Sequence, residues 1–391
     1  METIRQKAEP LANSPKLGQV KGFRDYIGEE AQKRAEIKKI LAETFEKYGF
    51  EPAETPVIET EEFVRGENPN DEAVSDIYKL EDKGKRKLAL RYEFTFQLKR
   101  LMQNKKLPFK RYQIGEVFRD EPVSANRLRQ FVQCDVDTIS STIKDDAEIL
   151  TLTKEVLSKL GIKFKIYIGN RALLNEIIDE LEIKADKNQI LREIDKLGKI
   201  DEKDIKASLK KYKAEALLDI LKKPEKYFER YQNYKDISEL KKYCKYYGVE
   251  IILQPSLVRG LSYYNKNVFE VKTSEAKETI VGGGSYIFNG IQSTGISFGV
   301  DRLSSLAKID YEKEKYLIIS LDKDAEAIKL IEKLREKGKS GMIYYGKPSK
   351  ALEYANSYKF SKVIFVGEKE IKEKKFKVKD MKSGKESLLK I

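Results

Sequence analysis

The sequence contains no histidine and no tryptophan among its 391 residues, and only two cysteines, Cys134 and Cys244. The absence of imidazole excludes a histidine base, a histidine metal ligand and a serine–histidine triad. Two cysteines far apart in the chain form neither a disulfide framework nor a zinc site, and they fit reduced cytosolic thiols. Catalysis would therefore have to use arginine, carboxylate, tyrosine or lysine side chains, or a bound metal ion.

Long apolar runs are absent as well. No stretch of about 18 apolar residues occurs, so no membrane-spanning helix is predicted. The polar segment 1–16 lacks the apolar core of a secretion signal. We therefore expect a cytoplasmic protein, and a chain of 391 residues is long enough for two domains.

The charge balance is basic. The 77 lysines and arginines against 64 acidic residues give a net charge of +13 and a pI near 9.2. A positive field of this size favours an anionic partner such as nucleic acid. A lysine-rich composition that merely decorates helix surfaces gives the same balance, so the charge permits an RNA partner without establishing one.

Hydrophobic periodicity predicts a first region that mixes helices and strands. The predicted helices are residues 30–48 and 146–160, with a further helix that begins near Asp301. The predicted strands are residues 54–58, 88–91, 112–118, 131–138, 163–168, 250–253, 268–272 and 278–281. Residues 171–243 are rich in Lys, Glu, Leu and Ile and contain a single glycine, Gly198, which indicates an inserted helical module.

The last segment has a different pattern. Short apolar strands at 316–320, 341–345 and 362–366 alternate with predicted helices at 325–336 and 349–358. This alternation is typical of a small α/β domain with a largely parallel sheet. We therefore predict a first domain over residues 1–311, a second over 312–391, and a linker at 312–315.

The most informative stretch is residues 111–122, Arg-Tyr-Gln-Ile-Gly-Glu-Val-Phe-Arg-Asp-Glu-Pro. An apolar strand delivers Arg119 and Glu121 to its end, a polar loop carries Arg127 and Arg129, and a second strand returns. Such a hairpin presents several guanidinium groups together, and their planar forks suit polyphosphate. An ordinary hairpin with solvated arginines would have the same pattern.

These residues resemble motif 2 of the class II aminoacyl-tRNA synthetases, whose core Phe-Arg-x-Glu occurs at 118–121. Residues 295–303, Gly-Ile-Ser-Phe-Gly-Val-Asp-Arg-Leu, resemble motif 3, and the best candidate for motif 1 is 54–58 with Pro56. The resemblance implies an α+β catalytic domain built on an antiparallel sheet, here with a helical insertion, and a small α/β C-terminal domain.

Further segments resemble the histidyl members of that class. Residues 257–264, Leu-Val-Arg-Gly-Leu-Ser-Tyr-Tyr, match the subgroup's Leu-Val-Arg-Gly-Leu-Asp-Tyr-Tyr at seven of eight positions. Val-Gly-Gly-Gly-Ser-Tyr at 281–286, Leu-Arg-Tyr-Glu-Phe-Thr at 90–95 and Gln-Cys-Asp-Val-Asp at 133–137 resemble three more of its motifs, the last in its archaeal and eukaryotic form. The resemblance runs from about residue 21 to 305, and the last domain resembles the anticodon-binding domain of these enzymes.

The resemblance implies an ATP site. Arg119 would hold the α-phosphate and Arg127 and Arg302 the outer phosphates, Phe131 would stack on adenine, and Glu121 would belong to the same site. Activation would join the amino acid carboxylate to the α-phosphorus of ATP and expel pyrophosphate. This step needs charge neutralisation and in-line positioning rather than a histidine base. We expect Mg²⁺ to enter with ATP, and the sequence predicts no separate metal site.

The resemblance also implies a site for L-histidine. Arg259 would be a second catalytic cation beside Arg119, at the α-phosphate and the substrate carboxylate. Glu93 and Thr95 would bind the α-amino group, and Gln133 would add a polar contact. The imidazole would be recognised by a further group of side chains, Asp137, Tyr263, Tyr264 and Tyr286. A structural arginine is the alternative for Arg259, and core aromatic packing is the alternative for the first two tyrosines, Tyr263 above all.

The chain departs from the histidyl pattern at three positions, where an aspartate, an arginine and an aspartate are replaced by Ser262, Ser285 and Ile287. These changes suit a catalytically silent relative, such as the regulatory subunit of ATP phosphoribosyltransferase. A synthetase of prolyl or threonyl specificity and a plain RNA-binding module are further alternatives. The favoured hypothesis is a histidine–tRNA ligase that binds ATP, L-histidine and tRNA(His), acts as a homodimer and has no membrane partner.

Overall fold

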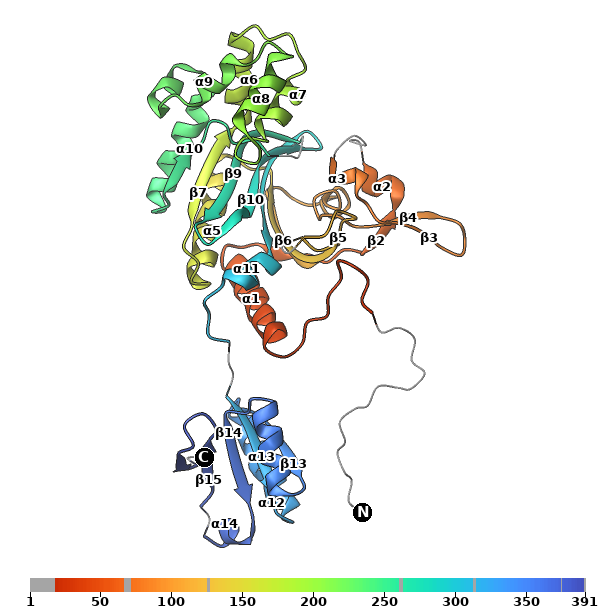
Figure 1. Cartoon of the computed structure of the whole chain (residues 1–391), viewed down its shortest axis with the longest axis vertical. Coiled ribbons are helices and arrows are strands. Elements are labelled where there is room, and N and C mark those ends of the chain that lie inside the picture. The colour runs from red at the N-terminus through yellow and green to blue at the C-terminus, as the bar shows by residue number, and fades with distance from the viewer. Residues whose placement is uncertain are drawn as a thin grey trace. The chain divides into compact units, whose positions relative to one another are not determined.

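The computed structural model describes residues 18–66, 72–124, 127–259, 263–311, 314–373 and 375–389 (Figure 1). The chain divides between Ile309 and Asp310 into two compact units. Part of the predicted linker, residues 312–313, lies outside the described residues. None of the described helices is both long and apolar enough to cross a membrane.

An eight-stranded sheet forms the centre of the first unit, in the order β1-β5-β6-β11-β10-β9-β7-β8. Its interior pairs are antiparallel, whereas the outer pairs β1–β5 and β7–β8 are parallel. The strands are β1 (Glu51–Pro52), β5 (Phe109–Phe118), β6 (Gln130–Ile139), β7 (Lys165–Asn170), β8 (Ile251–Leu253), β9 (Tyr264–Thr273), β10 (Ala276–Phe288) and β11 (Ile291–Gly299). The antiparallel core predicted from the resemblance is confirmed.

Helices cover one face of this sheet. α1 (Gly28–Lys47) and α5 (Ile143–Lys159) pack against each other and against the core, and α11 (Val300–Leu306) packs against α1. Their buried side chains join Cys134 and Val136 of β6 in one hydrophobic cluster. Since side chains alternate along a strand, Gln133, Asp135 and Asp137 point to the opposite face. The sheet therefore has an apolar face under the helices and a polar face available for chemistry.

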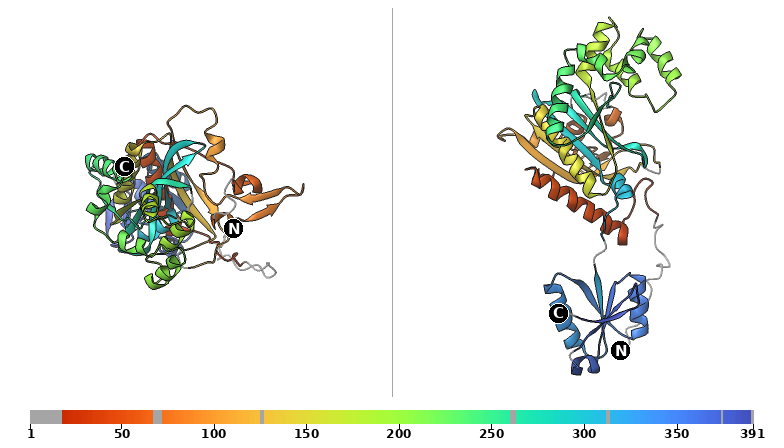
Figure 2. Two further views of the ribbon diagram at one scale, coloured as in Figure 1. Left: turned by 90° about the horizontal axis from the view of Figure 1, so that it is seen from above. Right: turned by 90° about the vertical axis from the view of Figure 1, so that its left-hand side faces the viewer.

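A small second sheet, in the order β2-β4-β3, stands apart from the main one (Figure 2). Its strands are β2 (Ile58–Thr60), β3 (Lys79–Glu81) and β4 (Lys87–Leu90), and the short helices α2 (Glu61–Arg65), α3 (Glu72–Ser75) and α4 (Leu98–Leu101) accompany it. The predicted strand at 54–58 is wrong apart from its last residue. Pro56 has no N–H to donate, and the Thr55 and Pro56 carbonyls accept from the side chains of Arg91 and Gln97 instead of a neighbouring strand.

The predicted helical insertion is confirmed and forms a compact group of helices (Figure 1). It comprises α6 (Arg171–Glu180), α7 (Lys187–Ile194), α8 (Glu202–Lys210), α9 (Ala216–Leu221), a 3₁₀ helix (Glu225–Arg230) and α10 (Tyr234–Tyr246). Asn170, Asp186 and Asp201 cap three of these helices with their side chains. The insertion leaves the sheet at the end of β7 and returns to it at β8.

The second unit has a five-stranded sheet in the order β13-β12-β14-β15-β16. The first three strands, β12 (Lys315–Ser320), β13 (Ser340–Tyr345) and β14 (Lys362–Val366), are parallel as predicted, and β15 (Lys377–Asp380) and β16 (Glu386–Leu388) extend the sheet in antiparallel fashion. Alternate residues of β12 pack on opposite faces: Ile318 against α12 (Asp324–Glu336), and Leu317 against α13 (Pro348–Ser357). The short helix α14 (Glu368–Glu373) follows β14.

Candidate active site

A cavity of about 540 Å³ opens on the polar side of the first unit. Residues from the N-terminal segment, α1, the β5–β6 hairpin, β9, β10, β11 and α11 contribute to its wall. Seven of the residues predicted to bind ATP or histidine line it: Arg119, Glu121, Arg127, Phe131, Gln133, Arg259 and Arg302. The sequence motifs, which are up to 183 positions apart (302 minus 119), therefore meet at one site.

Arg119 is held from several directions just beyond the end of β5. Its Nε donates to the Tyr92 carbonyl at 3.2 Å, and its Nη2 donates to Gln133 Oε1 at 3.3 Å. The guanidinium carbon lies 5.2 Å from the centre of the Phe131 ring. These contacts fix the plane of the guanidinium while it remains partly exposed to the cavity.

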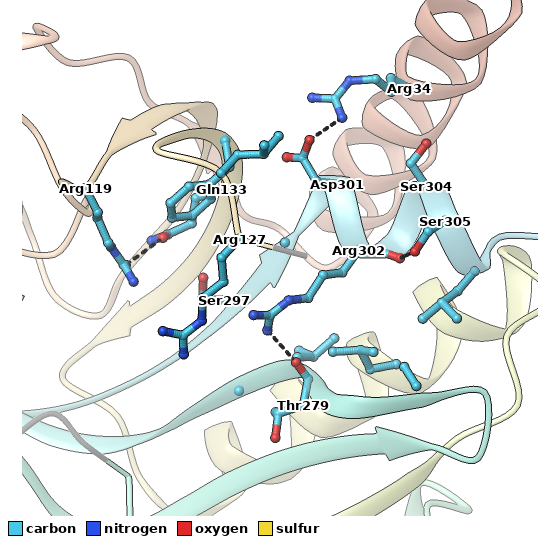
Figure 3. A pocket seen from close by; sticks show the side chains of 18 of the residues that line it. Arg34, Arg119, Arg127, Gln133, Thr279, Ser297, Asp301, Arg302, Ser304 and Ser305 are labelled. Atoms are coloured by element: carbon cyan, nitrogen blue, oxygen red, sulfur yellow. Dashed lines mark hydrogen bonds and ion pairs between the residues drawn. The ribbon is translucent and has the colours of Figure 1, made fainter. Parts of the chain in front are cut away.

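Two more arginines approach the same cavity from other elements (Figure 3). Arg302, in α11, donates from Nη1 to the Thr279 carbonyl of β10 at 2.7 Å. Arg127 pairs with Glu121, with 3.1 Å between Nη1 and Oε2, and its side chain is 62% exposed. Arg302 is thus fixed by the sheet, whereas Arg127 lies on the hairpin loop and pairs there with the carboxylate of Glu121.

Arg259 adds a fourth cation just before β9. Its Nη1 lies 3.5 Å from the Phe269 carbonyl and 3.8 Å from Oε1 of Glu270. A Cβ at Gly282 would lie only 1.6 Å from that nitrogen, so the guanidinium rests directly on the backbone of β10. The missing side chain at position 282 is therefore what gives this cation its place in the cavity.

The other predicted histidine-binding residues form a buried cluster that adjoins the cavity through Arg259, whose guanidinium lies 5.9 Å from the Tyr264 ring. Tyr263 packs on Tyr264 and Tyr286, with ring centres 4.7 and 5.5 Å apart. Tyr286 donates its hydroxyl to Asp137 at 2.6 Å. None of these residues lines the cavity. Burial is the first cause that raises the pKa of all three tyrosine hydroxyls, so the hydroxyls stay protonated.

Asp137 has a partner that the sequence patterns did not indicate. Arg111, which no solvent reaches, lies with its Nη2 2.8 Å from Asp137 Oδ2. The two residues are opposite each other in the β5–β6 register. The Arg111 guanidinium and the Tyr286 hydroxyl therefore both bind the Asp137 carboxylate and fix its orientation at the edge of the site.

Glu93 and Thr95 follow β4 on a loop. Glu93 is buried and Thr95 is half-buried, and neither lines the cavity. Glu93 is close enough to Tyr263 and Tyr264 for its charge to raise the pKa of both hydroxyls, after the larger effect of burial. These two residues thus lie with the buried tyrosine cluster rather than with the phosphate-facing arginines.

Protein-family models match nearly the whole chain. The model described as Histidyl-tRNA synthetase matches residues 22–303, and the Anticodon binding domain model matches residues 315–391. The chain belongs to the histidyl-tRNA synthetase family. It is an aminoacyl-tRNA ligase, and its second unit is a tRNA-binding domain of the anticodon-binding type.

Named relatives in this family are similar along their full length. Histidine–tRNA ligase 1 of Bacillus cereus (strain ATCC 10987 / NRS 248) is 32% identical over 409 residues, which cover 94% of each chain. The histidine–tRNA ligase of Methanocaldococcus jannaschii is 33% identical over 407 residues, 94% of this chain and 96% of the relative. The fold matches the crystal structure of the Nostoc sp. PCC 7120 histidyl-tRNA synthetase with a TM-score of 0.82, at 22% identity and 97% coverage of both chains.

The departures from the histidyl pattern have separate surroundings. Ser285 points away from the tyrosine cluster and donates to Asp146 Oδ2 at 2.9 Å, and Asn267 donates to the same oxygen. Burial raises the pKa of Asp146 to about 6. Ile287 is 53% exposed, and Ser262 lies outside the described residues. Neither Ser285 nor Ile287 therefore lines the cavity that holds the arginines.

Sequence patterns missed the N-terminal side of the cavity. Asp301 of α11 accepts from Arg34 of α1 at 2.6 Å (Figure 3). It also accepts from the Tyr26 hydroxyl at 2.7 Å and from the Val132 amide at 2.9 Å. It thereby joins the N-terminal segment and α1 to the strand that carries Phe131. The adjacency of Asp301 to Arg302 was the signal in the sequence, but the partners could not be identified before the fold was known.

Proposed function

We propose that this family member is a histidine–tRNA ligase. It would join the carboxylate of L-histidine to the α-phosphorus of ATP, with release of pyrophosphate, and transfer the histidyl group to the 3′ end of tRNA(His). The observation that carries the proposal is the convergence of four guanidinium groups, from Arg119, Arg127, Arg259 and Arg302, on one cavity. Permanently charged bidentate donors are suited to a triphosphate and to the charge that develops at its α-phosphorus.

From their contacts, we assign different roles to these four arginines. Arg119 and Arg259, which protein atoms hold on either side of the cavity, would neutralise the α-phosphate and the substrate carboxylate during attack. Arg302 and the exposed Arg127 would hold the departing pyrophosphate. Phe131, which also lines the cavity, would stack on adenine. As the carboxylate oxygen bonds to phosphorus, the bond to pyrophosphate breaks, so no side-chain nucleophile is required.

Mg²⁺ would enter with ATP. Across the described ranges, no group of three or more candidate metal-ligating side chains occurs. The cavity does hold the carboxylates of Glu121 and Glu270. One or two carboxylates together with phosphate oxygens are the usual environment of Mg²⁺, so these residues fit a metal ion that the nucleotide brings.

The buried tyrosine cluster supports histidine as the amino acid. Imidazole carries two nitrogens at a fixed separation, and the Tyr286–Asp137–Arg111 chain supplies oriented polar groups next to Arg259. A site with buried polar groups rejects analogues that leave them unpaired. ATP–pyrophosphate exchange with a panel of amino acids tests the proposal: exchange that depends on histidine is expected, and exchange driven by another amino acid would refute the specificity.

Arg259→Ala tests the assignment of roles. We expect exchange to fall at least 10²-fold because an oriented cation at the reacting phosphate is lost. Arg86→Ala is the matched control and should exchange normally, because the Arg86 side chain lies on the turn between β3 and β4 and is 78% exposed. Near-normal exchange by Arg259→Ala would show that the cation is a structural residue.

One alternative is a regulatory role. A Bacillus halodurans structure titled an ATP phosphoribosyltransferase regulatory subunit/histidyl-tRNA synthetase matches the fold with a TM-score of 0.77, at 20% identity and coverage of 91% of this chain and 99% of that one. Stimulation of ATP phosphoribosyltransferase without any exchange activity would favour that role. The matched anticodon-binding domain and the four arginines favour the ligase.

We also propose a homodimer. Val57, Ile58 and Leu80, on and beside the small three-stranded sheet, are 38%, 49% and 39% exposed, so the first unit carries exposed apolar side chains at this sheet. Sedimentation equilibrium should give twice the chain mass, and Ile58→Lys should shift the protein toward monomers. A monomeric wild type at micromolar concentration would contradict this assignment.

A further inference from the structure

A buried carboxylate with no role in the assignments above lies next to Gln133 and Ser297, both of which line the cavity. Asp135 lies at the centre of β6 and pairs with Gln113 of β5 on one side and with Ser297 of β11 on the other. Its exposed fraction is only 5%, and it points to the same face as Gln133. Burying a charged group is costly unless it is hydrogen-bonded, so this carboxylate should have a function that offsets the cost.

The carboxylate determines which way the Gln133 amide points. Gln133 Nε2 donates to both oxygens of Asp135, at 3.0 and 2.9 Å. An ionised carboxylate only accepts hydrogen bonds, so the nitrogen of the amide must face it. The amide oxygen is then left facing Arg119, whose Nη2 donates to it at 3.3 Å.

The other charged groups around Asp135 do not orient the Gln133 amide. The charge of Arg111 acts on Asp135, but its Nη2 lies 2.8 Å from Asp137 and pairs with that carboxylate. Burial raises the pKa of Cys134 and of Tyr264, and the charge of Asp135 raises the pKa of both groups further above neutrality. Burial raises the pKa of Asp135 itself to about 6, with Arg111 opposing and Asp137 adding to the shift. Of Asp135, Cys134 and Tyr264, Asp135 is therefore the residue whose pKa lies near 6.

We propose that Asp135 is a positioning residue for ATP activation: its carboxylate fixes the Gln133 amide, and the amide oxygen holds the Arg119 guanidinium in its phosphate-binding orientation. The proposal rests on the proposed function because Arg119 is assigned there to the α-phosphate. In Asp135→Asn the new side chain can donate as well as accept, so it no longer requires the Gln133 nitrogen to face it, and the amide can turn so that this nitrogen faces the guanidinium. Two donors cannot bond to each other, so Arg119 loses its contact.

A double-mutant cycle tests this relay. Asp135→Asn should lower kcat/KM for ATP in the exchange reaction by about 10²-fold, the effect of a catalytic group misplaced by about 1 Å. In a Gln133→Met background, where no amide remains to be oriented, Asp135→Asn should change kcat/KM less than about 2-fold, because coupled residues are non-additive. Equal losses in both backgrounds, or no loss in either, would overturn the proposal.

The pH profile of kcat/KM for ATP is a second measurement, and substitution of a merely structural residue would not change it. The wild type should lose kcat/KM for ATP below about pH 6 relative to Asp135→Asn, because protonation turns one acceptor oxygen of Asp135 into an O–H donor, and the carboxyl then no longer requires the amide nitrogen to face it. Parallel profiles would contradict the proposal. Thermal unfolding of each variant verifies the fold, and Asp135→Ala is a second variant should the asparagine destabilise it.

Failure of the proposed function can be told apart from failure of the relay. A wild type without histidine-dependent exchange would refute the ligase function alone. The same cycle is therefore also measured as the dissociation constant for ATP by calorimetry, which needs no turnover. Additive effects on that constant would refute the relay, whatever the reaction catalysed.

Discussion

Gly282→Ala should inactivate the protein while leaving it folded. In the structure a Cβ at position 282 would lie 1.6 Å from Nη1 of Arg259, 2.4 Å from its Cζ and 2.7 Å from its Nη2. Non-bonded heavy atoms need about 3.5 Å, so the guanidinium would have to move by roughly 2 Å. A displacement of 1 Å can already cost about 10²-fold in rate, and we expect ATP–pyrophosphate exchange to fall by at least that factor.

The fold should tolerate this substitution because the conflicting atoms are the far end of a flexible side chain. The free energy of unfolding should change by no more than about 1 kcal/mol, the usual size of a glycine-to-alanine effect at a compatible backbone position. Gly299→Ala is the matched control: Gly299 lines the same cavity, but its added Cβ would lie 3.8–3.9 Å from Arg302, an ordinary contact.

Steady-state exchange and calorimetric unfolding on the wild type and both variants measure these effects. Gly299→Ala should retain exchange within a few-fold. The reasoning fails if Gly282→Ala exchanges at the wild-type rate, since the guanidinium would then act from a position about 2 Å away. It also fails if both variants lose exchange equally, because the loss would then not depend on Arg259.

Three further predictions concern stability. Arg111→Met should cost about 3–5 kcal/mol of unfolding free energy because it leaves Asp137 buried without its cation, and adding Asp137→Leu should recover most of the loss in thermal unfolding. Burial raises the pKa of Asp146 from 3.8 to about 6, so the native state binds the proton more tightly than the unfolded state does. The unfolding free energy of the wild type should therefore fall by up to about 3 kcal/mol relative to Asp146→Asn as the pH rises from 4 to 7. Calorimetry at both pH values measures this, and a constant difference between the two proteins would refute it. Thr142→Ala removes half of the capping box of α5 and should cost about 1 kcal/mol in denaturant titrations.

The sequence predicted the long elements and the arginine convergence well. Helix α1 and the β5–β6 hairpin carry strong periodicity, and their boundaries agree with the prediction to within a few residues. Most of the segments missed are short ones, such as β15, β16 and the helices beside the small sheet, because three to five residues contain too little periodicity to be detected. The nine-residue strand β11 was also not among the strands predicted from periodicity. The resemblance implied that Arg119, Arg259 and Arg302 belong to one site, and all three line the same cavity.

Partners that depend on strand register could not be predicted. Arg111 and Asp137 are opposite each other only because β5 and β6 pair in one particular register, and a shift of β5 by one residue would turn Arg111 to the other face of the sheet, away from Asp137. The same register places Gln113 beside Asp135. Likewise, Ser285 and Tyr286 are adjacent in the chain but bond to Asp146 and Asp137 respectively. Residue identities alone therefore could not separate the cavity-lining arginines from the buried cluster behind them.

The place where the helical insertion joins the sheet limits how its length can vary. β7 and β8 are parallel neighbours, so the chain between them must cross from one end of the sheet to the other, and no tight turn can replace it. Lengthening such a connection costs only about 0.6 kcal/mol for each doubling of a flexible loop. Relatives can thus carry a larger or a different module at this place. A relative with a much shorter connection would either keep at least one crossover helix between β7 and β8 or lose β8.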